Sequence, residues 1–185
     1  MSVLVFSFFI VAPLLSHANN NDDLIYQDQY SQSTFGGIGL IQTPTARFSN
    51  DGEFGFGISV EDPYNRLYAK MQFFPWLEAV LRYTEGTHES YHGGCCSSKQ
   101  TWKDKGLDLK IRLLKESKVI PEIAIGLVDL GGTGAYSSEY LVASKRFENL
   151  DWSLGLGWGT LGGVTHFNNI LGWLDDDRRR RGGYK

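Results

Sequence analysis

Paired charges of opposite sign are the residues of this sequence whose types and spacing could support acid–base chemistry. Glu78 stands four positions before Arg82, and Asp108 stands two positions before Lys110. Glycoside cleavage needs two carboxylates held across a cleft at a defined separation, and the sequence shows no such pair. It also contains no nucleophile motif, phosphate-binding loop or dinucleotide fingerprint. We therefore expect a protein that is not an enzyme and that binds no cofactor.

A second group of reactive residues lies in the segment THESYHGGCCSSK, which carries His88, His92, Cys95 and Cys96. Structural zinc sites usually space their cysteines by two to four residues, whereas these two are adjacent. A disulfide between neighbouring cysteines would be strained. We expect no metal site here, and the sequence fits either an oxidised pair or two free thiols in an exposed loop.

The charged residues stand in segments whose apolar side chains recur at every second position, the pattern of a strand with one apolar and one polar face. In GEFGFGISVE, for example, Phe54, Phe56, Ile58 and Val60 alternate with polar or small residues. The 22 glycines and the 14% of aromatic residues also favour strands and tight turns. The segments predicted as strands are 35–42, 52–61, 66–74, 76–84, 106–114, 121–128, 138–147 and 150–159.

Short turns and longer loops alternate along the chain, so an up-and-down antiparallel sheet would have one trimmed end and one elaborated end. Outer-membrane barrels show this asymmetry, together with aromatic girdles. Aromatic residues beside the short turns are Phe73, Phe74, Trp76, Phe147 and Trp152. We predict an all-β fold, an antiparallel up-and-down outer-membrane β-barrel of about eight strands. Alternation alone also fits a secreted β-sandwich that binds carbohydrate or protein.

The regions outside the strands predict export. Residues 1–18 form an apolar run that ends in Ser16-His17-Ala18, with small residues where a signal peptidase cleaves. The run is shorter than the ~20 apolar residues of a spanning helix. We predict a cleaved signal peptide at 1–18, a flexible lead-in at 19–33, barrel strands at 34–160 and a divergent polar tail at 161–185. The net charge of -3 leaves no broad basic surface for nucleic acid.

Four stretches follow one another in a specific order: GGIGLIQTPTARFSNDGEFGFGIS, YNRLYAKMQFFPWLEAVLRYTEG, KGLDLKIRLLKES and PEIAIGLVDLGGTGAYSSEYLVASKRFENLDWSLGLGWG. They resemble the amino-terminal part of the YjbH family of exopolysaccharide and capsule biosynthesis proteins, which includes GfcD. The resemblance implies an outer-membrane β-barrel protein of Gram-negative bacteria, with outer-membrane lipid, exopolysaccharide and other polysaccharide-export proteins as partners. Because family members are longer, we expect these strands to be part of a larger barrel.

In this interpretation the apolar faces meet lipid and the opposite faces line a lumen. The aromatic residues expected in the girdle or facing lipid are Phe73, Trp76, Phe147, Trp152 and Trp158. The polar residues expected to face the lumen are Glu53, Lys70, Glu78, Arg82, Asp108, Lys110, Arg112 and Glu122. These charges could contact a sugar polymer or pair with one another. For a barrel of eight strands, whose interior is just wide enough to be filled by side chains, we favour internal ion pairs.

Overall fold

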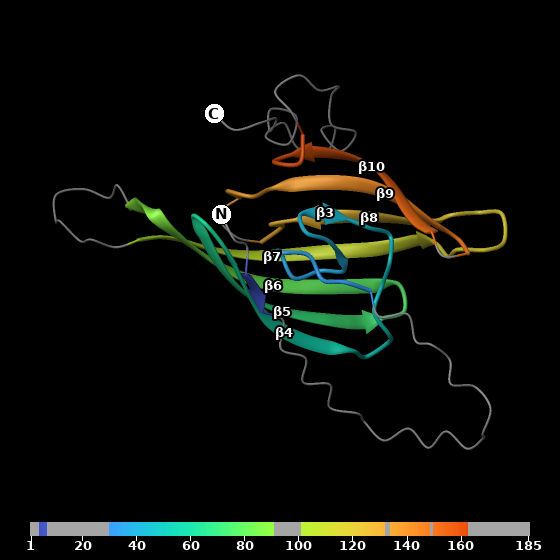
Figure 1. Cartoon of the computed structure of the whole chain (residues 1–185), viewed down its shortest axis with the longest axis horizontal. Coiled ribbons are helices and arrows are strands. Elements are labelled where there is room, and N and C mark those ends of the chain that lie inside the picture. The colour runs from blue at the N-terminus through green and yellow to red at the C-terminus, as the bar shows by residue number, and fades with distance from the viewer. Residues whose placement is uncertain (1–3, 7–29, 91–100, 132–133, 149, 163–185) are drawn as a thin grey trace, which may run out of the picture.

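A computed structural model of the chain describes residues 4–6, 30–90, 101–131, 134–148 and 150–162. Its main feature is an eight-stranded antiparallel sheet in the order β1-β4-β5-β6-β7-β8-β9-β10 (Figure 1). These strands are β1 (Leu4–Phe6), β4 (Phe54–Glu61), β5 (Tyr64–Phe74), β6 (Leu77–Ser90), β7 (Thr101–Leu114), β8 (Glu122–Val128), β9 (Ser138–Phe147) and β10 (Leu150–Gly159). A separate hairpin comprises β2 (Gly39–Leu40) and β3 (Thr43–Pro44). The all-β class predicted from the sequence is confirmed.

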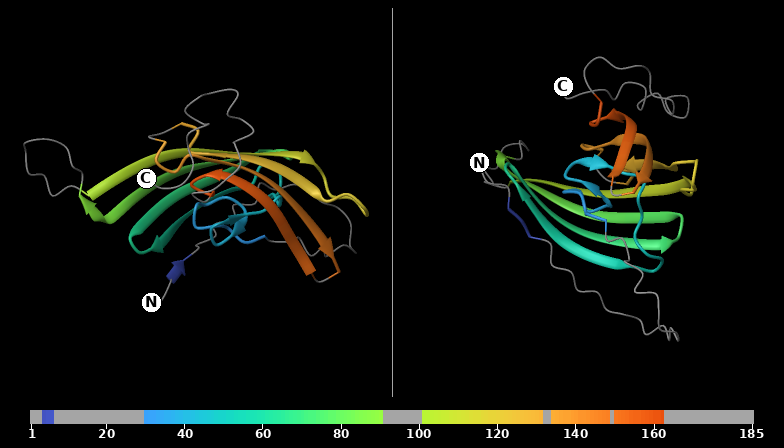
Figure 2. Two further views of the ribbon diagram at one scale, coloured as in Figure 1. Left: turned by 90° about the horizontal axis from the view of Figure 1, so that it is seen from above. Right: turned by 45° about the vertical axis from the view of Figure 1, so that its right-hand side comes forward.

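The main sheet curls into an open half-barrel. Figure 2 shows its strands as an arc, with the segment that contains β2 and β3 lying inside the hollow. From β4 to β10, each strand pairs with the next along the chain, as expected for an up-and-down sheet. In the described part of the chain, β10 pairs only with β9, and the outer side of β4 pairs only with the three residues of β1. These residues therefore do not close a complete eight-stranded barrel.

One predicted strand, residues 35–42, lies outside the main sheet. Positive φ angles at Gly36 (99°) and Ile41 (50°) turn the chain twice, so this segment cannot run extended beside β4. It contributes to the β2-β3 hairpin instead. The place beside β4 is taken by Leu4–Phe6, which belongs to the predicted signal peptide. The other seven predicted strands all lie in the main sheet.

The two faces of the main sheet have the reverse polarity of those in a water-soluble protein. We call the side toward the hollow the concave face and the opposite side the convex face. Buried polar side chains on the concave face are Arg66, Lys70, Gln72, Glu78, Arg82, Asp108, Lys110 and Glu122. Exposed apolar side chains on the convex face include Phe54, Phe56, Ile58, Val60, Leu67, Phe73, Leu81, Leu113, Leu154 and Leu156. A half-solvated antiparallel sheet ordinarily buries its apolar face instead.

Two tyrosines on the concave face lie flat across glycines of the neighbouring strand. Tyr68 on β5 pairs with Gly57 on β4, and Tyr140 on β9 pairs with Gly126 on β8. A Cβ atom added to Gly126 would lie 2.0 Å from the Tyr140 ring carbon Cζ, and one added to Gly57 would lie 2.5 Å from the Tyr68 hydroxyl oxygen. Glycine at both positions leaves room for the ring, which a side chain there would have to displace.

The carboxyl-terminal end of β10 differs from the prediction. Trp158, expected to face lipid, is only 3% exposed. Its cross-strand neighbour Glu139 is only 2% exposed, so the convex face is covered at this end of β9 and β10. The chain leaves the strand at Gly159, where φ is 69°, and the N–H of Gly162 donates to the Gly159 carbonyl (3.0 Å). The prediction of an exposed Trp158 is wrong. The convex face is open at the centre of the sheet, but at this end it is covered.

Candidate functional site

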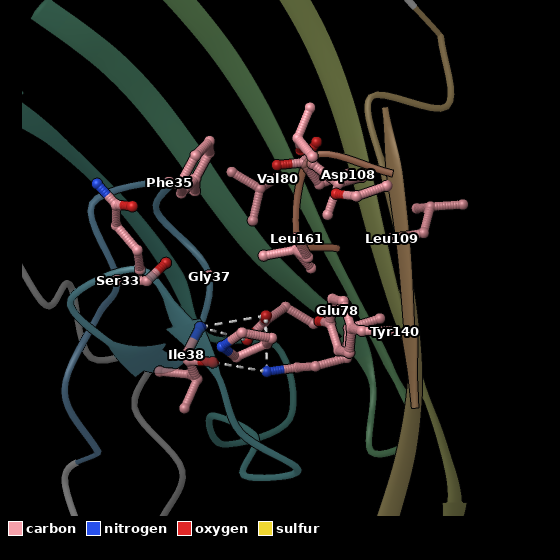
Figure 3. A pocket seen from close by; sticks show the side chains of 16 residues that line it. Ser33, Phe35, Gly37, Ile38, Glu78, Val80, Asp108, Leu109, Tyr140 and Leu161 are labelled. Atoms are coloured by element: carbon pink, nitrogen blue, oxygen red, sulfur yellow. Dashed lines mark hydrogen bonds and ion pairs between the residues drawn. The ribbon is translucent and has the colours of Figure 1, made fainter. Parts of the chain in front are cut away.

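Residues 30–52, here called the inner segment, lie in the hollow of the sheet and bring backbone groups against its polar face. The carboxylate of Glu78 accepts a hydrogen bond from the N–H of Ile38 (3.2 Å) (Figure 3). Lys110 Nζ donates to the carbonyl oxygens of Ile38 (3.1 Å) and Arg47 (2.8 Å). Buried backbone groups need such partners. The charged face of the sheet therefore supplies hydrogen bonds to a segment that has little regular structure of its own.

Each of the eight polar residues expected to face a lumen takes part in an ion pair within the half-barrel. The pairs and their N···O distances are Lys70–Glu53 (2.9 Å), Arg82–Asp108 (2.5 Å), Lys110–Glu78 (3.0 Å) and Arg112–Glu122 (2.6 Å). Two of these pairs join β6 to β7, and one joins β7 to β8. Burying a charge is costly unless it is paired and hydrogen-bonded. Alternation places these residues on one face, and the curled sheet brings the partners together.

Arg47 of the inner segment forms the largest ion-paired group and was not identified from the sequence. Its Nη1 lies 2.5 Å from a carboxylate oxygen of Glu116 and 3.0 Å from one of Glu122. Its Nη2 lies 2.6 Å from Asp151, to which Nε also donates (3.0 Å). Arg47 thus connects the hollow to the β7-β8 turn, to β8 and to β10. Its only sequence signal is that it is the sole charge in the stretch IQTPTARFSN.

Aromatic rings of the inner segment lie against the guanidinium and ammonium groups of the sheet. The guanidinium carbon of Arg112 lies 4.3 Å from the ring centroid of Phe48, and Lys110 Nζ lies 4.7 Å from it. At the other end of the segment, Arg66 and Arg82 each approach the ring of Phe35 to 4.8 Å. Such cation–π contacts strengthen when the groups are removed from water. They offset part of the cost of burying these cations.

The hollow is also covered at the end where the longer connections lie, here called the loop end. Tyr136, from the connection between β8 and β9, makes edge-on ring contacts with Phe35 (6.1 Å between centroids), Tyr64 (5.9 Å) and Trp102 (5.7 Å). The N–H of Tyr136 donates to Asp129 (3.1 Å). Strands β5 and β7, the β8-β9 connection and the inner segment therefore meet in one aromatic cluster.

A small cavity of about 70 Å³ remains between the inner segment and the sheet (Figure 3). Phe35 and Ile38 line it from the inner segment, and Val80, Leu109 and Tyr140 line it from the sheet. Glu78 and Asp108 also border the cavity, but both carboxylates already accept from cations. The cavity holds about a few water molecules.

Glu116, in the turn between β7 and β8, has the clearest electrostatic perturbation outside the strands. Burial alone would raise its pKa. The backbone N–H of Arg146 (2.9 Å), the guanidinium of Arg47 and the ammonium of Lys145 (3.2 Å) outweigh that effect and lower the pKa of Glu116 to about 2. These donors stabilise the charged carboxylate. Glu116 is therefore an anion under all physiological conditions.

The concave charges are arranged as a structural network. In the part of the chain that the structure describes, no three His, Cys, Asp or Glu side chains converge as metal ligands would. His92, Cys95 and Cys96 lie outside the described residues, so the expectation about their chemistry stays a prediction. The carboxylates of Glu78, Asp108 and Glu122 each form an ion pair with a cation of the concave face.

Comparison with known proteins identifies the family. The sequence model described as "Exopolysaccharide biosynthesis protein YbjH" matches residues 31–185, most of the chain. The chain belongs to the YjbH family. The resemblance inferred from the order of motifs is thereby confirmed, and the model's description associates the family with exopolysaccharide biosynthesis.

A relative of this YjbH-family chain is the "Uncharacterized lipoprotein YjbH" of Escherichia coli (strain K12), which is 49% identical over 142 residues. The alignment covers 76% of this chain and 20% of the relative. The chain thus spans about a fifth of the length of the curated relative it matches. No solved structure matches the chain significantly.

The predicted aromatic girdle of this YjbH-family chain lies on the outside of the sheet, except for Trp158. Phe73, Trp76, Phe147 and Trp152 are exposed, and Phe74 stacks on Trp76 with 5.5 Å between ring centroids. Phe73, Phe74 and Trp76 surround the β5-β6 turn, and Phe147 and Trp152 flank the β9-β10 turn. Both turns lie at the end of the sheet opposite the loop end. Their position agrees with an aromatic girdle at one boundary of an apolar surface.

Proposed function

We propose that this chain forms the amino-terminal part of an outer-membrane β-barrel protein that acts in exopolysaccharide or capsule assembly or export and catalyses no reaction itself. The observation that carries the proposal is the reversed polarity of the sheet. Its convex face exposes large apolar side chains, whereas its concave face buries paired charges. A barrel in lipid has an apolar exterior and a polar interior.

The size of the apolar surface favours lipid over water as its surroundings. Monomeric soluble proteins rarely expose contiguous apolar patches of more than about a few hundred Å². Here exposed apolar side chains continue across the neighbouring strands β4, β5 and β6, and others lie on β10 at the far edge of the sheet. A β-sandwich would cover such a face with a second sheet, and none of the described strands lies on it.

Export to the outer membrane is supported by two features. The apolar run at residues 1–18 has the length and the small terminal residues of a signal peptide. The Escherichia coli relative is named a lipoprotein, a class of exported and membrane-anchored proteins. In this proposal the signal peptide is removed, and β1 is absent from the mature protein. The edge of β4 then becomes available to another strand.

In this proposal the ion pairs of the interior and the external connections have different roles. Because the concave charges pair with one another and with the inner segment, they hold the wall together. The external connections, and the further segments of the longer family proteins, would then contact the polysaccharide or other export proteins. Loss of the gene should lower the amount of cell-surface polysaccharide while intracellular sugar-nucleotide pools persist, since transport and not synthesis of precursors is affected.

Fractionation of a Gram-negative host that expresses the chain with its own amino terminus tests the location. We expect recovery in outer-membrane fractions and migration on a gel that changes on heating, because folded barrels resist detergent until they are heated. Cytoplasmic, periplasmic and inner-membrane marker proteins serve as controls. Recovery as a soluble periplasmic monomer whose migration does not change on heating would contradict the barrel and support the secreted β-sandwich.

A further inference from the structure

The convex face contains a groove. An apolar surface facing lipid does not by itself require such a depression. It has a volume of about 570 Å³ and lies across β4 to β7. Phe56, Leu67 and Leu81 form its walls, and the small side chain of Ala69 contributes to its floor. Leu81 is the most exposed of these side chains, at 62%. The groove is therefore an apolar depression in the surface that the proposed function assigns to lipid.

One end of the groove is polar and positively charged. Lys105 lines it at the loop end, directly across the strand pair from Tyr83. Lys103 lies two residues earlier on β7, on the same face, because the intervening Asp104 points into the hollow and is 1% exposed. Continuing along this face of β7 from Lys105, the next outward side chain is Leu107. The change from lysine to apolar residues marks the boundary of the apolar surface.

These two lysines differ from the cations of the concave face. The described residues place no carboxylate within ion-pair distance of Lys103 or Lys105. Glu85 lies directly across the strand pair from Lys103, and its carboxylate accepts a hydrogen bond from the hydroxyl of Thr101 (2.5 Å). Two exposed cations that form no ion pair with a described residue thus lie at the polar end of an apolar groove.

We propose that this groove binds a lipid with an anionic phosphate head group, with one acyl chain against Leu81 and Leu67 and the phosphate beside Lys105 and Lys103. The assignment rests on the proposed function, since it requires the convex face to meet a membrane. Lysine is a strong donor to phosphate as a point charge, and Tyr83 lies where aromatic side chains settle at membrane boundaries. An uncharged apolar partner would leave Lys105, which lies across the strand pair from Tyr83, without a counter-charge from the described residues.

Native mass spectrometry of the full chain, purified in a mild detergent, tests the proposal. Dioleoyl phosphatidylglycerol is titrated against dioleoyl phosphatidylcholine, which has the same acyl chains and no net charge. We expect the anionic lipid to bind more tightly. The double variant Lys103→Gln/Lys105→Gln should lose about thirtyfold in affinity for it, the loss expected from removing two cations near a lipid surface. Inorganic phosphate should not compete, because it cannot occupy the groove.

The matched control is Lys115→Gln/Lys118→Gln, which removes two exposed lysines at the opposite end of the sheet. This variant should retain wild-type affinity. Equal binding of both lipids, or equal binding by the two double variants, would overturn the lipid site while leaving the barrel intact, provided that the protein still shows heat-dependent migration. If inorganic phosphate alone competed, the two lysines would bind a free anion and not a lipid head group, and the lipid proposal would be overturned. Recovery of a soluble, non-barrel protein would overturn both proposals.

Discussion

Arg47 and Asp151 are 104 residues apart in the chain and form a two-point ion pair, with Nε donating to Oδ2 (3.0 Å) and Nη2 to Oδ1 (2.6 Å). Asp151 stands at the start of β10, the last strand of the sheet. Because Arg47 also contacts Glu116 and Glu122, one buried guanidinium holds three acidic groups from different parts of the half-barrel. The inner segment therefore connects distant strands of the curved sheet through Arg47.

Replacing Arg47 by Gln should strongly destabilise the protein. The substitution leaves Glu122 without its guanidinium partner from the inner segment and releases β10 from that segment. We expect the free energy of unfolding to fall by about 3 kcal/mol, the lower end for breaking a buried ion pair. Urea unfolding in detergent micelles measures the change. Lys118→Gln, which removes an exposed cation, is the control, and an equal effect of both substitutions would contradict the role of Arg47.

Replacing Gly126 by Ala should displace the Tyr140 ring that lies across it. The new methyl group would overlap the ring, so we expect a loss of about 1 to 3 kcal/mol in unfolding free energy, as for overpacked cores. Gly131→Ala is the matched control, because its nearest neighbour atom would lie 3.9 Å from the added Cβ. Adding Tyr140→Ala to Gly126→Ala should cost less than the sum of the two single substitutions. Strict additivity would show that the two residues do not interact.

Replacing Leu81 by Arg distinguishes lipid from water on the convex face. If β6 spans a membrane, a cation at this position, between the midplane and the boundary near Tyr83, should cost more folding free energy than the ~1 kcal/mol found near the interfaces and less than the ~4 kcal/mol of the midplane. Folding into phospholipid vesicles, followed by tryptophan fluorescence over a urea series, measures it. Leu130→Arg, in the connection between β8 and β9, should have little effect. A neutral Leu81→Arg would indicate that this face meets water.

Acidification should weaken the contacts of Glu116. Its pKa is lowered to about 2 in the folded protein, whereas an unperturbed glutamate has a pKa of about 4.3. The stabilisation is therefore fully present above about pH 4.3 and is lost as the pH falls toward 2. The difference in unfolding free energy between wild type and Glu116→Gln should shrink over that interval.

The control for this titration is Glu148→Gln, which alters an exposed carboxylate in the neighbouring β9-β10 turn. Its difference from wild type should stay nearly constant with pH. If the Glu116→Gln difference also stayed constant, Glu116 would not contribute through its charge, and the hydrogen bonds from Arg146 and Lys145 would have to be insensitive to protonation.

Strands and the side of each strand were predictable because alternation is a local property. In β4, β5, β6 and β7 the period of two separates apolar from charged side chains within a few residues, and no distant contact is needed to read it. The same reasoning failed for residues 35–42, where apolar residues and glycines suggest a strand but positive φ angles turn the chain. It also failed for Trp158, whose burial depends on what covers that end of the sheet.

The sequence by itself determined the family, the all-β class, most of the strands and which residues share a face, since order of motifs and periodicity are both encoded in neighbouring positions. Only the tertiary structure decided which charges pair, that the sheet curls around the inner segment, and that Arg47 joins this segment to β10. Those contacts join residues as much as 104 positions apart. Ion pairs depend on distance in space. The sequence pattern of IQTPTARFSN does not show which distant residues will lie beside Arg47.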